Sequence, residues 1–216
     1  FPAPILDRKI RFALVGCGRI AKNHFASLRT HQERAELVDV CDVDPAALAA
    51  AVAETGAKGH SNLTALLAQT TADIVILTTP SGLHPEQAIE IAASNRHVMT
   101  EKPMATRWHD GLRMVKACDE AAVRMFVVKQ NRRNDTLQLL KRAVDQNRFG
   151  RIYMVNINVF WTRPQEYYDS AAWRGTWEFD GGAFMNQASH YVDLLDWIVG
   201  PIESLQAYTG TLARNI

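Results

Sequence analysis

The sequence feature that most constrains the fold is a glycine-rich hexapeptide, G-C-G-R-I-A, at residues 16–21. It follows an apolar run, Ile10–Val15, and opens a stretch with helical periodicity. In this setting Gly16 permits the tight turn, Gly18 lets the backbone approach a pyrophosphate, and Ala21 keeps helix and strand close. The N-terminus of the helix offers N–H groups to phosphates. The hexapeptide therefore predicts a dinucleotide-binding turn, whose expected cofactor-binding residues are Gly16, Gly18, Arg19 and Ile20.

Short apolar runs alternate with helical periodicities throughout residues 9–130. This order is typical of an α/β domain with a Rossmann-type doubly wound parallel sheet, covered by helices on both faces. The expected strands are Ile10–Val15, Glu36–Cys41, Asp73–Thr78, His97–Thr100 and Met125–Val128. The expected helices are Ile20–Leu28, Pro45–Glu54, Asn62–Ala68, Pro85–Ala93 and Trp108–Ala122.

A carboxylate stands at the end of the second expected strand, about 20 residues after the glycine-rich turn. At this position Asp42 can accept hydrogen bonds from the ribose of an adenosine. The same carboxylate would repel a 2′-phosphate. The sequence therefore predicts NAD, rather than NADP, as the cofactor.

The pattern changes after the first domain, and residues 131–216 are expected to begin an α+β substrate-binding domain. A helix to about Asn147 is followed by alternation that is typical of a half-buried strand. The further elements expected are a strand at Arg151–Trp161, a helix from the Gly181-Gly182 turn to Val199, and a strand at Ile202–Tyr208. Two strands and two helices do not close a core. We therefore expect the C-terminal remainder of this domain to be absent, with apolar surface exposed beside both strands. Residues 1–8 are expected to be an N-terminal extension.

Composition narrows the class of partner. Hydrophobic residues make up 47% of the 216 residues and charged residues 22%, which excludes a disordered chain. With 24 basic and 23 acidic side chains and no long run of either sign, neither nucleic acid nor a membrane is an expected partner. The 3 cysteines are widely spaced, so we expect no disulfide framework, no metal site and a cytoplasmic location. Small molecules remain as the expected ligands.

Two segments, one in each domain, carry candidate catalytic side chains. Lys102 lies in an E-K-P tripeptide just past a strand, at the sheet edge where doubly wound folds bind ligands. Asn186 and His190 are four residues apart on an expected helix and so share one face. An isolated lysine or helical histidine is more often structural, so the assignment depends on the combination.

The combination resembles the glucose-fructose oxidoreductase / inositol dehydrogenase family. The shared elements are G-x-G-x-x-A, T-P-x-x-x-H ending at His84, E-K-P, and G-G followed by H-x-x-D ending at Asp193. The resemblance implies that Lys102 and His190 lie beside the nicotinamide of NAD. Many members have Asp one turn before the histidine, where this chain has Asn186. Further cofactor-binding residues implied by the resemblance are Asp42, Thr79, Pro80, His84 and Glu101.

Two longer segments are similar to one bacterial subgroup of this family. They read R-F-A-L-V-G-C-G-R-I-A-K-N-H-F and W-R-G-T-W-E-F-D-G-G-A-F-M-N-Q-A-S-H. The subgroup oxidises C3 of UDP-N-acetylglucosaminuronate in lipopolysaccharide sugar biosynthesis, and the resemblance implies that reaction here. Arg163 and Arg174 flank an aromatic loop and could bind an anionic sugar through planar donors. Surface charge or an internal salt bridge is the other interpretation of these arginines.

The implied reaction removes a hydride and a proton from a secondary hydroxyl of the sugar. His190 is favoured as the base because an imidazole titrates near neutrality. Lys102 would stabilise negative charge on the same oxygen, and Asn186 would orient the substrate or the histidine. The sequence leaves open whether His190 or Lys102 is the base, and whether NADH is released or reoxidised in place.

Two other functions remain open at this stage. The first is a free-sugar or inositol dehydrogenase, and the second is an NAD-sensing regulator built on the same fold. For the full-length protein, the expected assembly is a homo-oligomer.

Overall fold

The computed structural model describes residues 4–216, which form two units. The first unit ends at Val128, and the second comprises Lys129–Ile216. The first three residues of the expected N-terminal extension lie outside the described part of the chain.

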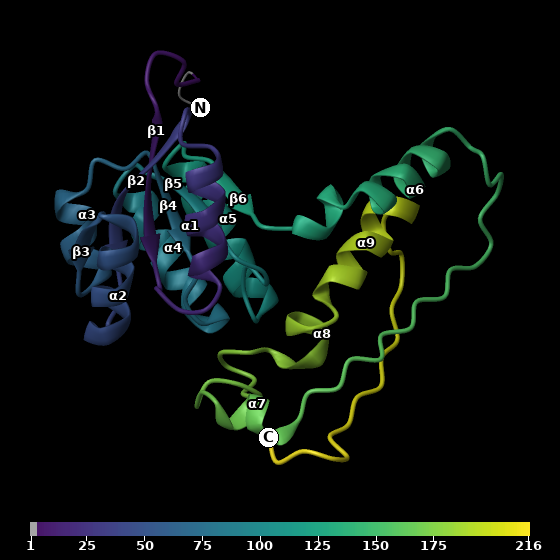
Figure 1. Ribbon diagram of the computed structural model, residues 1–216. Coiled ribbons are helices and arrows are strands. Elements are labelled where there is room, and N and C mark those ends of the chain that lie inside the picture. Colours follow the sequence, from purple (N-terminus) through teal and green to yellow (C-terminus); the bar gives the residue numbers. More distant parts are fainter. Residues whose placement is uncertain (1–3) are drawn as a thin grey trace. The chain divides into compact units, whose positions relative to one another are not determined.

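The first unit contains a sheet of six parallel strands in the order β3-β2-β1-β4-β5-β6 (Figure 1). The order reverses beside β1, which pairs with β2 on one side and β4 on the other. This arrangement is the doubly wound fold predicted from the sequence, and it places the ligand-binding edge where the strands end. The strands are β1 (Ile10–Val15), β2 (Ala35–Cys41), β3 (Lys58–His60), β4 (Ile74–Leu77), β5 (His97–Thr100) and β6 (Met125–Val127).

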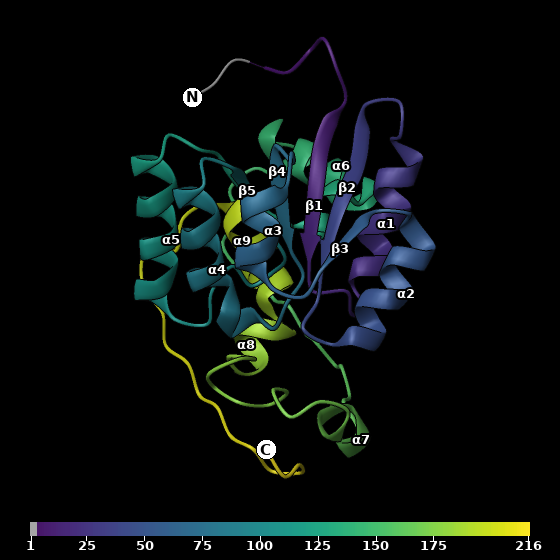
Figure 2. The same ribbon diagram turned by 90° about the vertical axis from the view of Figure 1, so that its left-hand side faces the viewer.

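Helices cover both faces of this sheet (Figure 2). Alternate strand residues point to opposite faces. Leu14 and Ile76 pack toward α1 and α2, whereas Ala13 and Val75 pack toward α3, α4 and α5. Burial on both faces explains why the central strand β4 is continuously apolar. The helices are α1 (Ala21–Thr30), α2 (Pro45–Thr55), α3 (Leu63–Gln69), α4 (His84–Ala93) and α5 (Trp108–Glu120), with a 3-10 turn η1 at Ser81–Leu83.

The second unit is helical. Two stretches expected to be strands, at 151–161 and 202–208, pair with no other strand within residues 4–216, so this expectation was wrong for the observed chain. A β-strand is defined by hydrogen bonds to a neighbour, and neither stretch has such a ladder here. The elements present are η2 (Gln130–Arg133), α6 (Asp135–Asp145), α7 (Gln165–Asp169), α8 (Gly182–Asn186) and α9 (Ser189–Val199).

The single helix expected after the Gly181-Gly182 turn is interrupted. Helix α8 ends at Asn186 and α9 begins at Ser189. The cause is local, because the N–H groups of Gln187 and Ala188 both donate to the carbonyl of Ala183, at 3.0 and 2.8 Å. Asn186 and His190 therefore lie on two successive helices rather than on one face of a continuous helix.

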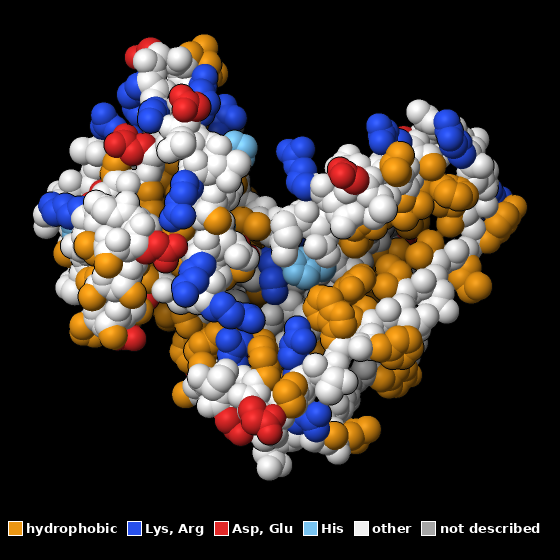
Figure 3. Space-filling view, in the orientation of Figure 1, with side chains coloured by type: hydrophobic (Ala, Val, Ile, Leu, Met, Phe, Trp, Pro, Cys, Tyr) orange, Lys and Arg blue, Asp and Glu red, His pale blue; other side chains and the backbone are white. Residues whose placement is uncertain are grey.

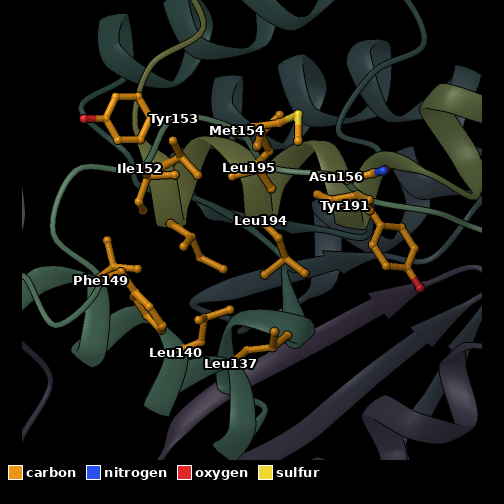
Figure 4. Close-up of a pocket in the computed structure, with 15 residues that line it drawn as sticks. Leu137, Leu140, Phe149, Ile152, Tyr153, Met154, Asn156, Tyr191, Leu194 and Leu195 are labelled. Atoms are coloured by element: carbon orange, nitrogen blue, oxygen red, sulfur yellow. The ribbon is translucent and has the colours of Figure 1, made fainter.

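An apolar pocket of about 560 Å³ lies between helices α6 and α9 and the segment at 152–157 (Figure 4). Leu140 of α6 and Leu194 of α9 line it, with Ile152 opposite. Hydrophobic side chains gather over this region on the surface (Figure 3). The exposed apolar surface expected beside the two stretches is therefore present, and Met154 and Leu205 are among its most exposed members.

Among the described residues, no helix has the length and apolar character required to span a membrane.

The core of the first unit generates a stability prediction. Leu14 is completely buried in β1, so Leu14→Ala removes apolar contacts and leaves a cavity. We expect the substitution to lower the free energy of unfolding by about 2–5 kcal/mol in urea titrations followed by circular dichroism. Leu112→Ala, at a half-exposed position of α5, is the matched control and should change it by about 0.5 kcal/mol or less. Equal losses for both variants would contradict this account of the core.

Candidate active site

The glycine-rich turn is held by a close approach of two strand ends. Gly16 has a φ of 96°, and a Cβ on it would lie 2.8 Å from the backbone of Thr78 and Thr79. The Thr78 hydroxyl donates to the carbonyl of Gly16 at 2.6 Å. Since no side chain fits between these backbones, glycine is required at position 16. The end of β1 is thereby fixed against the end of β4.

Gly18 has a different explanation from Gly16. The space around it shows whether a dinucleotide fits at this turn. A Cβ on Gly18 would meet nothing within 4 Å, so packing inside the chain does not account for the glycine. Helix α1, which follows, has no side-chain cap and no acidic residue in its first turn. Open space before uncapped N–H groups suits a pyrophosphate. Arg19 and Ile20, the other predicted residues of the turn, are exposed beside it.

Asp42 lies directly after β2 and joins two loops. One carboxylate oxygen accepts the N–H of Cys17 at 2.6 Å, and the other accepts the N–H of Asp44 at 2.8 Å. The carboxylate is thus held against the glycine-rich turn, at the position expected for ribose recognition. Burial, followed by the charge of Asp42, raises the pKa of the Cys17 thiol to about 12, so this thiol is neutral at physiological pH.

His84 connects the T-P-x-x-x-H motif to the E-K-P motif. Its buried ring places Nδ1 3.0 Å from the carbonyl of Pro103 and Nε2 3.0 Å from the carbonyl of Thr79. Burial lowers the pKa of this imidazole, although both carbonyls and Glu101 oppose the shift. The Thr79 hydroxyl donates to Gln87 of α4 at 2.6 Å, and Pro80 is half-buried. The imidazole therefore holds together the two loops that follow β4 and β5.

The E-K-P tripeptide is also held from α1. His24 of α1 lies with Nε2 2.8 Å from one carboxylate oxygen of Glu101. The other oxygen of Glu101 accepts the N–H of Lys102 at 3.3 Å. The Lys102 side chain is half-buried at this edge. Sequence reasoning missed the roles of His24 and Thr78, because their hydrogen-bond partners are far away in the chain.

In the second unit, the predicted catalytic residues flank the helix break. Asn186 is the last residue of α8, and His190, which is buried, is the second residue of α9. Asp193, the last residue of the H-x-x-D motif, accepts two hydrogen bonds from Arg132 at 2.6 and 2.8 Å. Lys129 lies 3.9 Å from the same carboxylate, and burial lowers its pKa. The motif aspartate thus anchors α9 to η2.

The two predicted substrate-binding arginines stack on one aromatic ring. The guanidinium of Arg163 lies 5.1 Å from the ring centre of Tyr167, and that of Arg174 lies 4.3 Å from it. Neither arginine forms an ion pair with an acidic residue within the described part of the chain, and the Nε atom of each is buried without a hydrogen-bond partner there. The internal salt bridge considered for them is therefore not seen.

The structure thus gathers two sets of predicted residues, one in each unit. At the carboxyl edge of the sheet lie the ends of β1, β2, β4 and β5, with Gly16, Asp42, Thr79 and Lys102. The second unit carries its own set, whose members are Arg163, Arg174, Asn186 and His190. The meeting of Lys102 and His190 at one substrate remains a prediction. The first set alone defines a dinucleotide-binding domain of the Rossmann class.

Comparisons with known families agree with this class. Residues 10–129 match the model of the oxidoreductase family with an NAD-binding Rossmann fold, GFO/IDH/MocA. Residues 137–216 match the model of the GFO/IDH/MocA C-terminal domain. The chain therefore belongs to the GFO/IDH/MocA oxidoreductases, and its first unit is an NAD-binding domain.

Among solved structures, the chain is similar to two WlbA dehydrogenases in complex with NADH and UDP-GlcNAcA. The protein from Chromobacterium violaceum is 76% identical with a TM-score of 0.98, over 100% of this chain and 63% of that one. The protein from Bordetella pertussis is 71% identical with a TM-score of 0.97, over 99% and 64%. An inositol 2-dehydrogenase from Saccharopolyspora erythraea is 29% identical over 88% of this chain and 54% of its own. The chain thus spans somewhat less than two thirds of these relatives.

The buried imidazole of His84 generates a pH-dependent stability prediction. Its pKa is lowered in the folded protein, whereas an exposed imidazole titrates near 6.5. The unfolded chain therefore takes up this proton first as the pH falls, and the stabilisation by His84 is lost below about pH 6.5. We expect the difference in unfolding free energy between wild type and His84→Gln to shrink from about pH 7.5 to about 5.5 in urea titrations. The exposed His109, changed to Gln, serves as control, and a difference that grows toward low pH would contradict the prediction.

Asp42 generates a prediction about cofactor choice. Asp42→Ala removes the charge that repels a 2′-phosphate and also frees the N–H of Cys17. We expect wild type to bind NAD much better than NADP, and the variant to reduce that preference by roughly tenfold, or about 1.4 kcal/mol. Calorimetry with both cofactors measures the ratio. Asp44→Ala, which removes the N-cap of α2, should leave the ratio unchanged, and equal affinities in wild type would refute the role of Asp42.

Proposed function

We propose that the protein oxidises the C3 hydroxyl of UDP-N-acetylglucosaminuronate with NAD as hydride acceptor. The observation that carries this proposal is the likeness to two WlbA dehydrogenases in complex with NADH and UDP-GlcNAcA, at 76% and 71% identity over 100% and 99% of this chain. The 29% identity to an inositol 2-dehydrogenase gives the free-sugar alternative much weaker support. A role in lipopolysaccharide sugar biosynthesis is part of the proposal.

The proposed reaction needs one base and one group that stabilises charge on oxygen. NAD, when bound, accepts the hydride from the sugar carbon. His190 takes the hydroxyl proton, since a ring nitrogen of neutral imidazole accepts it near neutral pH. Lys102 donates a hydrogen bond from Nζ to the same oxygen and stabilises its developing negative charge. Holding the hydroxyl between these two groups makes the proton transfer a positioned step.

The chemistry of the substrate accounts for the arginines. A uronate carboxylate and a diphosphate are planar or multidentate acceptors, which guanidinium groups bind through two parallel hydrogen bonds. Arg163 and Arg174 stack on Tyr167, and the Nε atom of each has no hydrogen-bond partner within the described part of the chain. We assign both to the substrate, with Asn186 as a further contact.

We further propose that the enzyme works in the cytoplasm and, at full length, as a homo-oligomer. The wide spacing of the 3 cysteines in the sequence supports this proposal of a reducing compartment.

Loss of either proposed catalytic group should abolish most turnover. We expect Lys102→Ala and His190→Ala in the full-length protein to lower kcat by about 100-fold or more, because proton transfer and charge stabilisation each contribute on that scale. NAD affinity should stay nearly constant. NADH fluorescence during incubation with UDP-N-acetylglucosaminuronate measures the rate, and calorimetry measures the affinity.

The exposed residues Lys116 and His109, each changed to Ala, are matched controls that should keep wild-type rates. A panel with other UDP-sugars and free inositol tests the substrate. Absence of turnover with every sugar, despite NAD binding, would favour a regulatory protein and overturn the proposed activity.

A further inference from the structure

A buried carboxylate in the second unit plays no part in the proposed reaction. Asp180 is 2% exposed and directly precedes the turn into α8. One of its oxygens accepts the N–H of Gly175 at 2.8 Å. The other accepts a hydrogen bond from the side-chain amide nitrogen of Asn186. A buried carboxylate needs donors, and this one has one for each oxygen.

The local backbone brings these groups together. The N–H groups of Asp180 and Gly181 both donate to the carbonyl of Thr176, at 3.0 and 3.1 Å. This tight turn leads into α8, a helix of five residues whose last residue is Asn186. The short helix thus returns the Asn186 side chain to the carboxylate six positions earlier.

A carboxylate accepts hydrogen bonds only, whereas an asparagine amide has a donor end and an acceptor end. Next to Asp180, the amide nitrogen of Asn186 must face the carboxylate. The carbonyl oxygen then points to the other side. Without such a partner, an asparagine could present either end to a ligand.

We propose that Asp180 is a positioning residue that orients the Asn186 amide, so that Asn186 presents a hydrogen-bond acceptor to a hydroxyl or acetamido N–H of the substrate. This inference rests on the proposed function, in which Asn186 contacts the sugar. It assigns the carbonyl oxygen of Asn186 the role of acceptor toward the substrate.

The pair also accounts for asparagine at position 186. An aspartate there would place a second carboxylate against Asp180, and two adjacent carboxylates disfavour their common ionised state. Asn186 supplies an acceptor oxygen without a second charge. The carboxylate of Asp180 therefore favours asparagine over aspartate at position 186.

Reversal of the pair tests the inference in the full-length protein. In Asp180→Asn, the new amide keeps an acceptor for Gly175 and donates to Asn186, which turns the Asn186 amide around. We expect kcat/KM for UDP-N-acetylglucosaminuronate to fall roughly tenfold or more while the protein stays folded.

The variant Asn186→Asp places two carboxylates against each other. Relative to wild type at the same pH, we expect a similar loss of kcat/KM at about pH 8 that diminishes toward about pH 6, as one carboxyl takes up a proton. The double variant Asp180→Asn/Asn186→Asp restores a donor facing a carboxylate, and its kcat/KM should return to within about threefold of wild type.

Asp196→Asn, at an exposed position of α9, controls for the loss of one charge and should leave kcat/KM unchanged. Wild-type kcat/KM in Asp180→Asn, or a folded double variant no better than the single variants, would overturn the positioning role.

If wild type does not turn over the UDP-sugar, the proposed function fails. The urea concentration at the unfolding midpoint then tests whether Asp180 and Asn186 interact. Asn186→Asp should lower that midpoint more at pH 8 than at pH 6, and the second substitution should restore it; no restoration overturns the pairing.

Discussion

The parallel direction of all six strands is the constraint from which the candidate site follows. Because every strand runs the same way, all the loops that leave the carboxyl ends meet at one edge of the sheet. Without contacts between them, these loops would not be held in fixed positions. The buried imidazole of His84 ties the loop after β4 to the loop after β5, and the close approach of Gly16 to Thr78 ties β1 to β4. Lys102 thus lies at a sheet edge whose loops are held in place by the contacts of His84 and of Gly16.

The sequence predicted those features of the fold that depend on local pattern. The strands at Ile10–Val15 and His97–Thr100 were predicted with their observed bounds, because each combines β-branched or apolar residues with buried positions. Strand β3, Lys58–His60, was missed because it is short, polar and at the sheet edge, and so carries no periodic pattern. Residues 202–208 have the composition of a strand, but a strand forms only when a neighbour supplies hydrogen bonds.

In the candidate site, too, only residues that lie in a local sequence pattern could be predicted. Gly16, Asp42 and Lys102 could be predicted as site residues because a phosphate turn and a strand end have recognisable sequence contexts. The partners that hold them were not found. His24 reaches Glu101 across 77 positions of the chain, and no local pattern encodes such a pairing. The break between α8 and α9 escaped notice because it depends on backbone hydrogen bonds around Ala188, a residue whose type favours helix.

The pairing of Asp180 with Asn186 has a consequence for how such a site can change over generations. Replacing either residue alone gives two facing carboxylates or two amides, and both states disturb the orientation that the pair maintains. The route between an aspartate and an asparagine version of this site therefore passes through a disadvantaged intermediate. The two positions are expected to covary, so that a lineage that has acquired one version tends to keep it even where its substrate would tolerate the other.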